Sequence, residues 1–313
     1  MKKISFPVIV WALMSAIGAV CTQAADTPTL KFLPSAQANA AVQKRLDAMA
    51  AASDAKLNLA YKTVGDVACT MDLFLPTTVK DKDGKAFYPD GAPVVLFFHG
   101  GGWAAGSRYT TLEGIALPET VKFFSDRGIA LALVSYRFIG NGLGVQDCIA
   151  DAFDAVRYLA LHAQEYRLDA KRMLSCGGSA GGHLALMLLY ANPDAFAGDA
   201  ALKNATFSFV GGVMRAPPVV FPGTVHRNFA PEMAPMHWIS AGAARALLVH
   251  GDKDTAVSIQ DSELFANKAK ELGVEVTLLK VPNADHHFKG KHQPLAGLTR
   301  NIFLNNLYAM ARE

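Results

Sequence analysis

The chain has 313 residues, of which 51% are hydrophobic and 18% are charged, and its formal net charge is +3. This length is enough to bury one large core, and no shift in composition marks a second compact unit of comparable size. The low net charge gives the protein no electrostatic reason to bind DNA, RNA or an anionic membrane.

The first 25 residues have the layout of a secretory signal peptide. Lys2 and Lys3 precede an apolar run over residues 4–20, and small residues at 22–25 offer a cleavage point. The apolar run is short for a transmembrane helix, so we expect no stable membrane anchor. Removal of the two lysines with the peptide lowers the formal charge from +3 to +1. The sequence therefore predicts a periplasmic or secreted protein.

The mature chain is expected to begin with an arm and to continue as one domain over residues 61–313. Residues 26–60 form the arm, and its apolar positions between 42 and 50 recur at helical spacing. Two strands around a Gly65-Asp66 turn then open the domain.

Continuous apolar runs predict strands that are covered on both faces of a parallel sheet. Such runs predict strands at 94–98, 129–136, 172–176, 207–210, 246–250 and 274–281. Helices are expected between them at 147–162 and 259–272. Strands that alternate with helices indicate an α/β fold with a doubly wound, mostly parallel sheet flanked by helices. Chemistry in such sheets gathers at the carboxyl ends of strands. The proline-rich insertion at 211–240 predicts a short cap.

The strongest motif is Gly177-Gly178-Ser179-Ala180-Gly181, which follows a predicted strand and precedes a predicted helix. It matches the nucleophile elbow G-x-S-x-G in its required context, so Ser179 is the candidate nucleophile. The glycines allow the strand and the helix to approach closely around a strained serine.

A second motif, His99-Gly100-Gly101-Gly102-Trp103, follows the strand at 94–98. Ester hydrolysis passes through a tetrahedral oxyanion, which needs backbone N–H groups aimed at it. This HGGG-type loop predicts an oxyanion hole formed by the amides of Gly101 and Gly102, together with that of Ala180 after the serine. Trp103 is the candidate wall of the acyl pocket.

A serine hydroxyl needs a base, which a carboxylate orients. The last predicted strand runs into His286 and His287, and the strand at 246–250 is followed by Asp252 and Asp254. The chain order serine, acid, histidine is that of α/β-hydrolases. We prefer Asp254 on the motif, and His287 remains the alternative to His286.

No metal or cofactor is expected, because no motif has the spacing of metal ligands. Three cysteines remain after the signal peptide is removed. Cys69 and Cys148 are the pair best suited to a disulfide in an oxidising compartment, and Cys176 reads as a buried thiol in an apolar strand.

Over residues 60–310 the chain resembles the hormone-sensitive-lipase-like and feruloyl-esterase-like branches of the α/β-hydrolases, in HGGGW, GGSAG, HGDKDTAV and HHF. This resemblance places the acid at Asp254 and the base at His286, and it implies hydrolysis of carboxylic esters without a cofactor. Two departures are Gly178, where an acidic residue is common, and His287 in place of a glycine.

The sequence thus predicts a serine hydrolase that cleaves short-chain acyl esters, such as acetyl esters, of a small molecule or a saccharide through an acyl-enzyme. A peptidase of the same fold and a non-catalytic ligand-binding homologue are the alternatives. Nothing in the sequence specifies the oligomeric state.

Overall fold

A computed structural model describes residues 35–111, 114–220, 229–288 and 294–313. The chain divides into two units, residues 1–43 and residues 44–313. The first unit is described only where it contributes the start of helix α2 (Ser35–Ala51). The predicted signal peptide lies outside the described residues. Within the described residues no helix is both long and apolar enough to cross a membrane.

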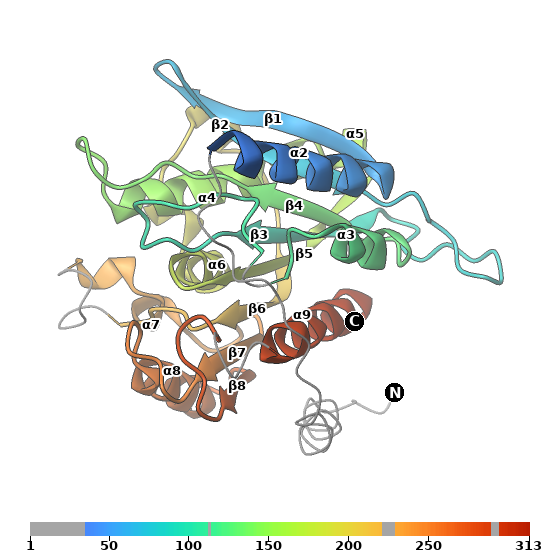
Figure 1. Cartoon of the computed structure of the whole chain (residues 1–313). Helices are drawn as coiled ribbons and strands as arrows, with labels where there is room; N and C mark the ends of the chain where they lie inside the picture. Colours follow the sequence, from blue (N-terminus) through green and yellow to red (C-terminus); the bar gives the residue numbers. More distant parts are fainter. Residues whose placement is uncertain (1–34, 112–113, 221–228, 289–293) are drawn as a thin grey trace. The chain divides into compact units, whose positions relative to one another are not determined.

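The second unit is built around an eight-stranded sheet (Figure 1) with the order β1-β2-β4-β3-β5-β6-β7-β8 in the described part of the chain. β1 and β2 pair antiparallel, β2 and β4 pair antiparallel, and every other neighbouring pair is parallel. The strands are β1 (Asp54–Val64), β2 (Val67–Leu75), β3 (Ala92–Phe98), β4 (Ala130–Val134), β5 (Leu168–Gly178), β6 (Phe209–Arg215), β7 (Ala246–Gly251) and β8 (Val276–Val281).

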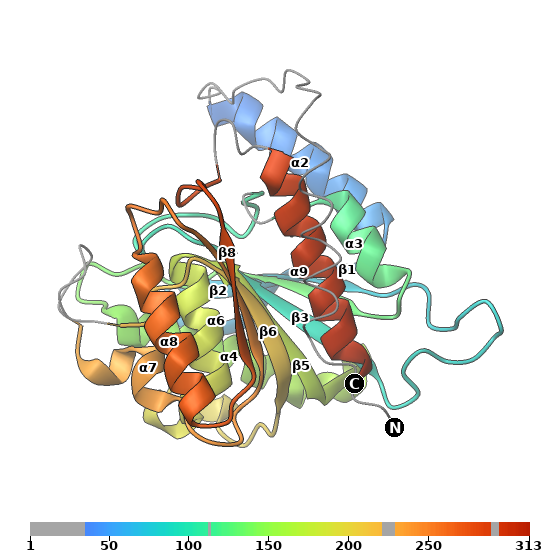
Figure 2. The same ribbon diagram turned by 90° about the horizontal axis from the view of Figure 1, so that it is seen from below.

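Helices cover both faces of this sheet, as Figure 2 shows. α4, α6 and α8 lie on one face, and α3 and α9 lie on the other. The helices of the second unit are α3 (Pro118–Ser125), α4 (Val145–Leu161), α5 (Ala163–Tyr166), α6 (Ala180–Tyr190), α7 (Pro235–Trp238), α8 (Ile259–Glu271) and α9 (Pro294–Arg312), with short 3-10 turns at Pro193–Ala195, Ala200–Leu202 and Pro231–Met233. The predicted doubly wound, mostly parallel α/β sheet is therefore confirmed.

The central strands of the sheet are buried on both faces, which is why continuous apolar runs predicted them. Every residue of β3, β4 and β7 is buried, because helices exclude water from both faces. The edge strands β1 and β8 are more exposed and mix polar with apolar residues. The core thus lies in the middle strands, and it holds their carboxyl ends in fixed positions.

Among the predicted boundaries that differ from the structure, two change the limits of the arm and of the cap. β1 begins at Asp54, so the last residues assigned to the arm, 54–60, belong to the sheet. β6 runs over Phe209–Arg215 instead of 207–210, because Gly211 and Gly212 continue the strand where they suggested its end. Residues 211–215 therefore belong to the sheet, and we use the term cap segment for residues 216–245, between β6 and β7.

The candidate disulfide between Cys69 and Cys148 is not formed in the structure, in which Cys69, Cys148 and Cys176 are free and buried. The Cys148 thiol donates to the carbonyl of Arg137 at 3.1 Å. The Cys69 thiol lies 3.9 Å from a carboxylate oxygen of Asp151. Each thiol thus has a polar neighbour of its own.

Candidate active site

The elbow that carries Ser179 is strained and tightly packed. Ser179 has φ +54° and ψ −124°, outside the regions that non-glycine residues prefer. Its N–H donates to the carbonyl of Arg215 at 2.8 Å, and its carbonyl accepts from His183 at 2.9 Å. A Cβ on Gly181 would overlap the carbonyl oxygen of Phe98, so only glycine allows this approach of helix to strand. Ser179 is half-buried at the carboxyl end of β5.

The HGGGW loop lies directly against this elbow. β3 and β5 are parallel neighbours, with Phe98 opposite Gly177, so the chain leaves both strands at the same edge. A Cβ placed on Gly100 would lie 3.5 Å from the Cβ of Ser179. His99 is buried beneath the loop, and its Nδ1 donates to the Gly100 carbonyl at 2.8 Å. The loop therefore packs beside the serine, where the sequence predicts an oxyanion hole.

Three backbone N–H groups are the candidate donors of the oxyanion hole. The amides of Gly101, Gly102 and Ala180 have no hydrogen-bond acceptor within the described part of the chain. Gly101 and Gly102 are exposed, so a ligand can reach their amides. Ala180 is the first residue of α6, and the first N–H groups of a helix have no acceptor within the helix. Gly101 and Gly102 have φ of +124° and +60°, which glycine adopts at little cost.

The candidate acid and base meet at this edge. Asp254 follows β7 and His286 follows β8, and these strands are parallel neighbours. Nδ1 of His286 lies 2.7 Å from Oδ2 of Asp254. A carboxylate only accepts, so Nδ1 carries the proton and Nε2 keeps a lone pair. The His286 ring is thus held in the tautomer that a general base needs.

Four donors surround the Asp254 carboxylate. Its Oδ1 accepts from the amides of Ala256 and Val257 at 2.8 and 2.9 Å, and its Oδ2 accepts from His286. Nε2 of His250 lies 3.1 Å from the same Oδ2. Burial alone raises the pKa of Asp254, but the hydrogen bonds from these groups outweigh it and hold the pKa well below its usual value. Asp254 is therefore charged at neutral pH.

The alternative residues lie elsewhere. Asp252 is exposed, and its carboxylate accepts from the backbone N–H of Asn283 at 2.6 Å, which ties the two loops together. His287 is also exposed, and its ring lies edge-on to that of His286. The structure brings Asp254 and His286 together, and it places Asp252 and His287 outside this pair.

Arg215 and His250 were not identified from the sequence. Arg215 ends β6, is buried, and accepts the Ser179 N–H with its carbonyl while its guanidinium donates to the carbonyl of His286. It therefore links the backbones of the serine and histidine loops. His250 is the second-last residue of β7, and its Nε2 lies 3.1 Å from Oδ2 of Asp254. The sequence signal for Arg215 is a charged side chain at the carboxyl end of an apolar strand, and the signal for His250 is its place at the start of the HGDKDTAV stretch.

Trp103, the candidate wall of the acyl pocket, is almost fully buried. Its side chain is buried between the rings of His183 and Phe229. Its role as a wall of the acyl pocket remains a prediction.

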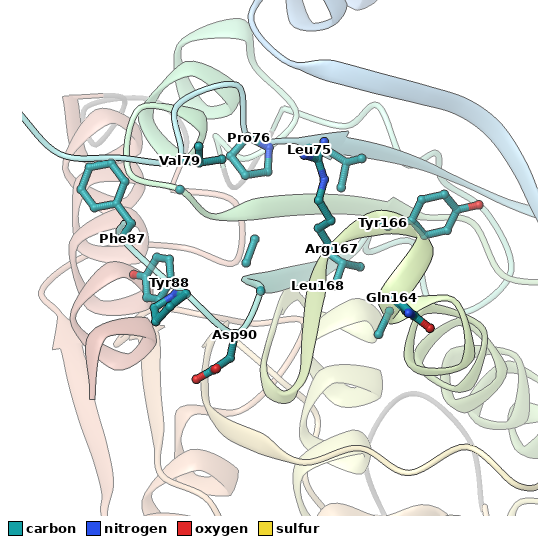
Figure 3. A pocket seen from close by; sticks show the side chains of 15 residues that line it. Leu75, Pro76, Val79, Phe87, Tyr88, Asp90, Gln164, Tyr166, Arg167 and Leu168 are labelled. Atoms are coloured by element: carbon teal, nitrogen blue, oxygen red, sulfur yellow. The ribbon is translucent and has the colours of Figure 1, made fainter. Parts of the chain in front are cut away.

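A separate cavity of about 420 Å³ lies far from this constellation (Figure 3). Its lining includes Leu75, Tyr88, Arg167 and Leu168, which lie near the amino ends of β3 and β5. Ser179 follows the opposite end of β5, so this cavity is not the site around the serine. Among the described residues, no cluster of His, Cys, Asp or Glu is arranged to hold a metal ion.

The chain is similar in sequence to known proteins. Residues 71–210 match the family model described as BD-FAE. The chain is 25% identical to the probable isoprenylcysteine alpha-carbonyl methylesterase ICMEL1 of Arabidopsis thaliana, over 74% of this chain and 51% of that protein. It is also 25% identical to the esterase LipC of Mycobacterium tuberculosis, over 69% of this chain and 59% of that protein. The chain thus spans about half the length of the curated relatives it matches.

The fold has solved counterparts. A butyrate-bound thermophilic esterase of Thermogutta terrifontis superposes with a TM-score of 0.67 at 24% identity, covering 82% of this chain and 94% of the esterase. Esterase 2 of the same species, phosphorylated by paraoxon, gives a TM-score of 0.63 at 25% identity, covering 80% and 94% of the two chains. These likenesses agree with the sheet order and the flanking helices described above.

Proposed function

We propose that this chain, whose residues 71–210 match the family model described as BD-FAE, is an α/β-hydrolase that hydrolyses carboxylic esters with Ser179 as its nucleophile. The observation that carries the proposal is the 2.7 Å contact between His286 and Asp254 at the sheet edge where the elbow presents Ser179. The similarity to esterases, including one that paraoxon phosphorylates, supports the same chemistry.

The first half of the reaction forms an acyl-enzyme. Nε2 of His286 takes the proton of the Ser179 hydroxyl as its oxygen attacks the ester carbonyl carbon. The carbonyl π electrons move to oxygen, and the amides of Gly101, Gly102 and Ala180 stabilise that charge. Collapse of the intermediate breaks the bond to the alcohol oxygen, which receives the proton from His286. The alcohol then leaves.

The second half returns the enzyme to its starting state. Water takes the place of the alcohol, gives a proton to His286 and attacks the acyl carbon. The second tetrahedral intermediate collapses to the carboxylic acid and releases the Ser179 oxygen, which recovers the proton. Asp254 keeps its charge throughout and stabilises the imidazolium that forms twice in each turnover.

We propose short acyl groups, such as acetyl, on a small-molecule or saccharide alcohol. A long acyl chain needs an apolar wall along its length, because each buried methylene contributes about 0.8 kcal/mol. The described parts of the cap segment supply only one turn at Pro231–Met233 and the four residues of α7. The butyrate bound in the Thermogutta terrifontis esterase supports the same size class.

We also retain the proposal of a periplasmic or secreted protein. Its basis is the signal-peptide pattern of residues 1–25. N-terminal sequencing of the protein from a secreting host should find a start near Ala25 or Asp26, and soluble protein that retains Met1 would contradict the proposal.

The experiment that tests the function measures kcat/KM on p-nitrophenyl esters from acetate to palmitate, for the wild type and for Ser179→Ala. We expect the highest values on the shortest esters and a loss of several orders of magnitude in the variant. A maximum on long esters would overturn the short-acyl proposal. Turnover of N-acylated peptide anilides without ester turnover would favour the peptidase, and no turnover of either class would favour a binding protein.

A further inference from the structure

The proposed oxyanion hole is assembled from two separate elements. Gly101 and Gly102 belong to the loop after β3, whereas Ala180 belongs to the first turn of α6. Oxyanion donors act only at about 3 Å from the oxygen, and a displacement of about 1 Å costs on the order of 10²-fold in rate. The loop must therefore be held in register with the helix.

A hydrogen bond between two buried side chains makes this connection. Trp103 directly follows Gly102, and its indole Nε1 donates to Nδ1 of His183 at 3.2 Å. The two rings also meet edge to face, with centroids 5.2 Å apart. His183 lies in the first turn of α6, where its N–H donates to the Ser179 carbonyl at 2.9 Å. One contact thus joins the oxyanion loop to the turn that carries the nucleophile.

The backbone of Trp103 depends on this anchoring. Its φ of +58° lies in the left-handed region, which non-glycine residues adopt only when their surroundings enforce it. Its carbonyl accepts from Ile139 at 2.9 Å, and its ring packs against Phe229. These contacts hold both the backbone and the ring of Trp103, and they thereby orient the amide of Gly102, one residue earlier.

The cap segment determines the tautomer of His183. The carbonyl of Met233 lies 2.7 Å from Nε2 of His183. A carbonyl only accepts and an indole only donates, so Nε2 carries the proton and Nδ1 keeps the lone pair that Trp103 needs. Burial lowers the pKa of His183 to about 4, so the ring remains neutral at physiological pH.

From these contacts we infer that His183 is a positioning residue, which aligns the two halves of the oxyanion hole through Trp103 and is itself held in the required tautomer by the carbonyl of Met233. The inference rests on the proposed esterase function. It also gives the cap segment a role beyond covering the substrate, because the cap segment orients the ring that holds the oxyanion loop.

Three single variants test this inference, together with the double variant that combines His183→Leu with Trp103→Phe. His183→Leu leaves the indole N–H without its acceptor, and Trp103→Phe removes the donor while keeping a ring. His183→Gln is the conservative variant, since its carboxamide both accepts and donates. The measurements are kcat and KM on p-nitrophenyl acetate, the inhibition constant of a trifluoromethyl ketone that forms an oxyanion on the serine, and the Tm.

We expect His183→Leu and Trp103→Phe to lower kcat by about 10–100-fold with KM changed less than about threefold. Ketone binding should weaken in parallel, His183→Gln should recover most of the rate, and the double variant should be no slower than the slower single variant. If His183→Leu does not fold, Trp103→Phe and the ketone carry the same test.

A lower Tm with unchanged kcat and ketone binding in both single variants would show a purely structural role and overturn the inference alone. Multiplying losses in the double variant would do the same. A wild-type protein that hydrolyses no ester would overturn the proposed function, and this inference with it.

Discussion

Nδ1 of His286 lies 2.7 Å from Oδ2 of Asp254, although 32 residues separate them in the chain. The parallel pairing of β7 and β8 brings their loops together, and Asp252 fastens one loop to the other through the Asn283 amide. The acid–base pair is therefore a product of strand order.

Replacing the paired histidine is expected to disable the enzyme. His286→Ala removes the proton acceptor of Ser179 and should lower kcat by on the order of 10⁴-fold or more. His287→Ala is the matched control, because this neighbour is exposed, and its rate should stay within about threefold of the wild type. Steady-state rates on p-nitrophenyl acetate decide between them, and the opposite ranking would assign the base to His287.

The two aspartates should differ just as sharply. Asp254→Asn replaces a charged acceptor by an amide that no longer fixes the His286 tautomer, so kcat should fall by on the order of 10⁴-fold. Asp252→Asn keeps an oxygen that can accept from Asn283, and its effect should be less than about fivefold. Equal losses in the two variants would refute the assignment of Asp254.

The oxyanion loop offers a test with two neighbouring glycines. A Cβ on Gly101 would overlap the carbonyl of Ala105, so Gly101→Ala must displace the loop and should cost on the order of 10²-fold in kcat. A Cβ on Gly102 meets nothing within 4 Å, so Gly102→Ala should leave the loop in place. It should lower the free energy of unfolding by about 1–2 kcal/mol through backbone strain, and its kcat should fall less than that of Gly101→Ala. Similar rates for both variants, with circular dichroism unchanged, would contradict the position assigned to the loop.

The elements that the sequence predicted well are those with local signals. Buried strands such as β3 and β7 consist mainly of apolar residues. At the elbow, a Cβ on Gly177 or Gly181 would overlap the carbonyl oxygen of Phe98, so this turn has a recognisable glycine pattern. The end of β6 was misplaced, because Gly211 and Gly212 resemble a strand end when their neighbours in the sheet are unknown.

The residues that the sequence did not reveal act through distant partners. Arg215 has its role because β6 lies between β5 and β7 in the sheet, which places it between the serine and histidine loops. His250 acts through a contact with Asp254 on the following loop. Arg215 has no spacing pattern that distinguishes it from an ordinary buried polar residue, and His250 opens the HGDKDTAV stretch, which indicates its position but not its contact with Asp254.

The buried histidine of α6 predicts how stability depends on pH. The pKa of His183 is about 4 in the folded protein and 6.5 ordinarily, so between these values the unfolded chain binds more protons. Its contribution is fully present above pH 6.5 and is lost as the pH falls toward 4. Asp254 acts in the same direction, but only below its usual pKa of 3.8.

Thermal melts of the wild type and His183→Gln across that window check this prediction. The wild-type Tm should fall more steeply with decreasing pH than the Tm of the variant, which has no group titrating at this position. Parallel curves would show that His183 does not resist protonation in the folded state.

Covalent trapping with paraoxon tests the central claim most directly. The intact protein is treated with paraoxon, digested and mapped by mass spectrometry, with Ser179→Ala treated in parallel. We expect one diethylphosphoryl group on the peptide that contains Ser179, formed in step with the loss of esterase activity and absent from the variant. Inactivation without modification of Ser179, or an equal degree of labelling in Ser179→Ala, would contradict its role as the nucleophile.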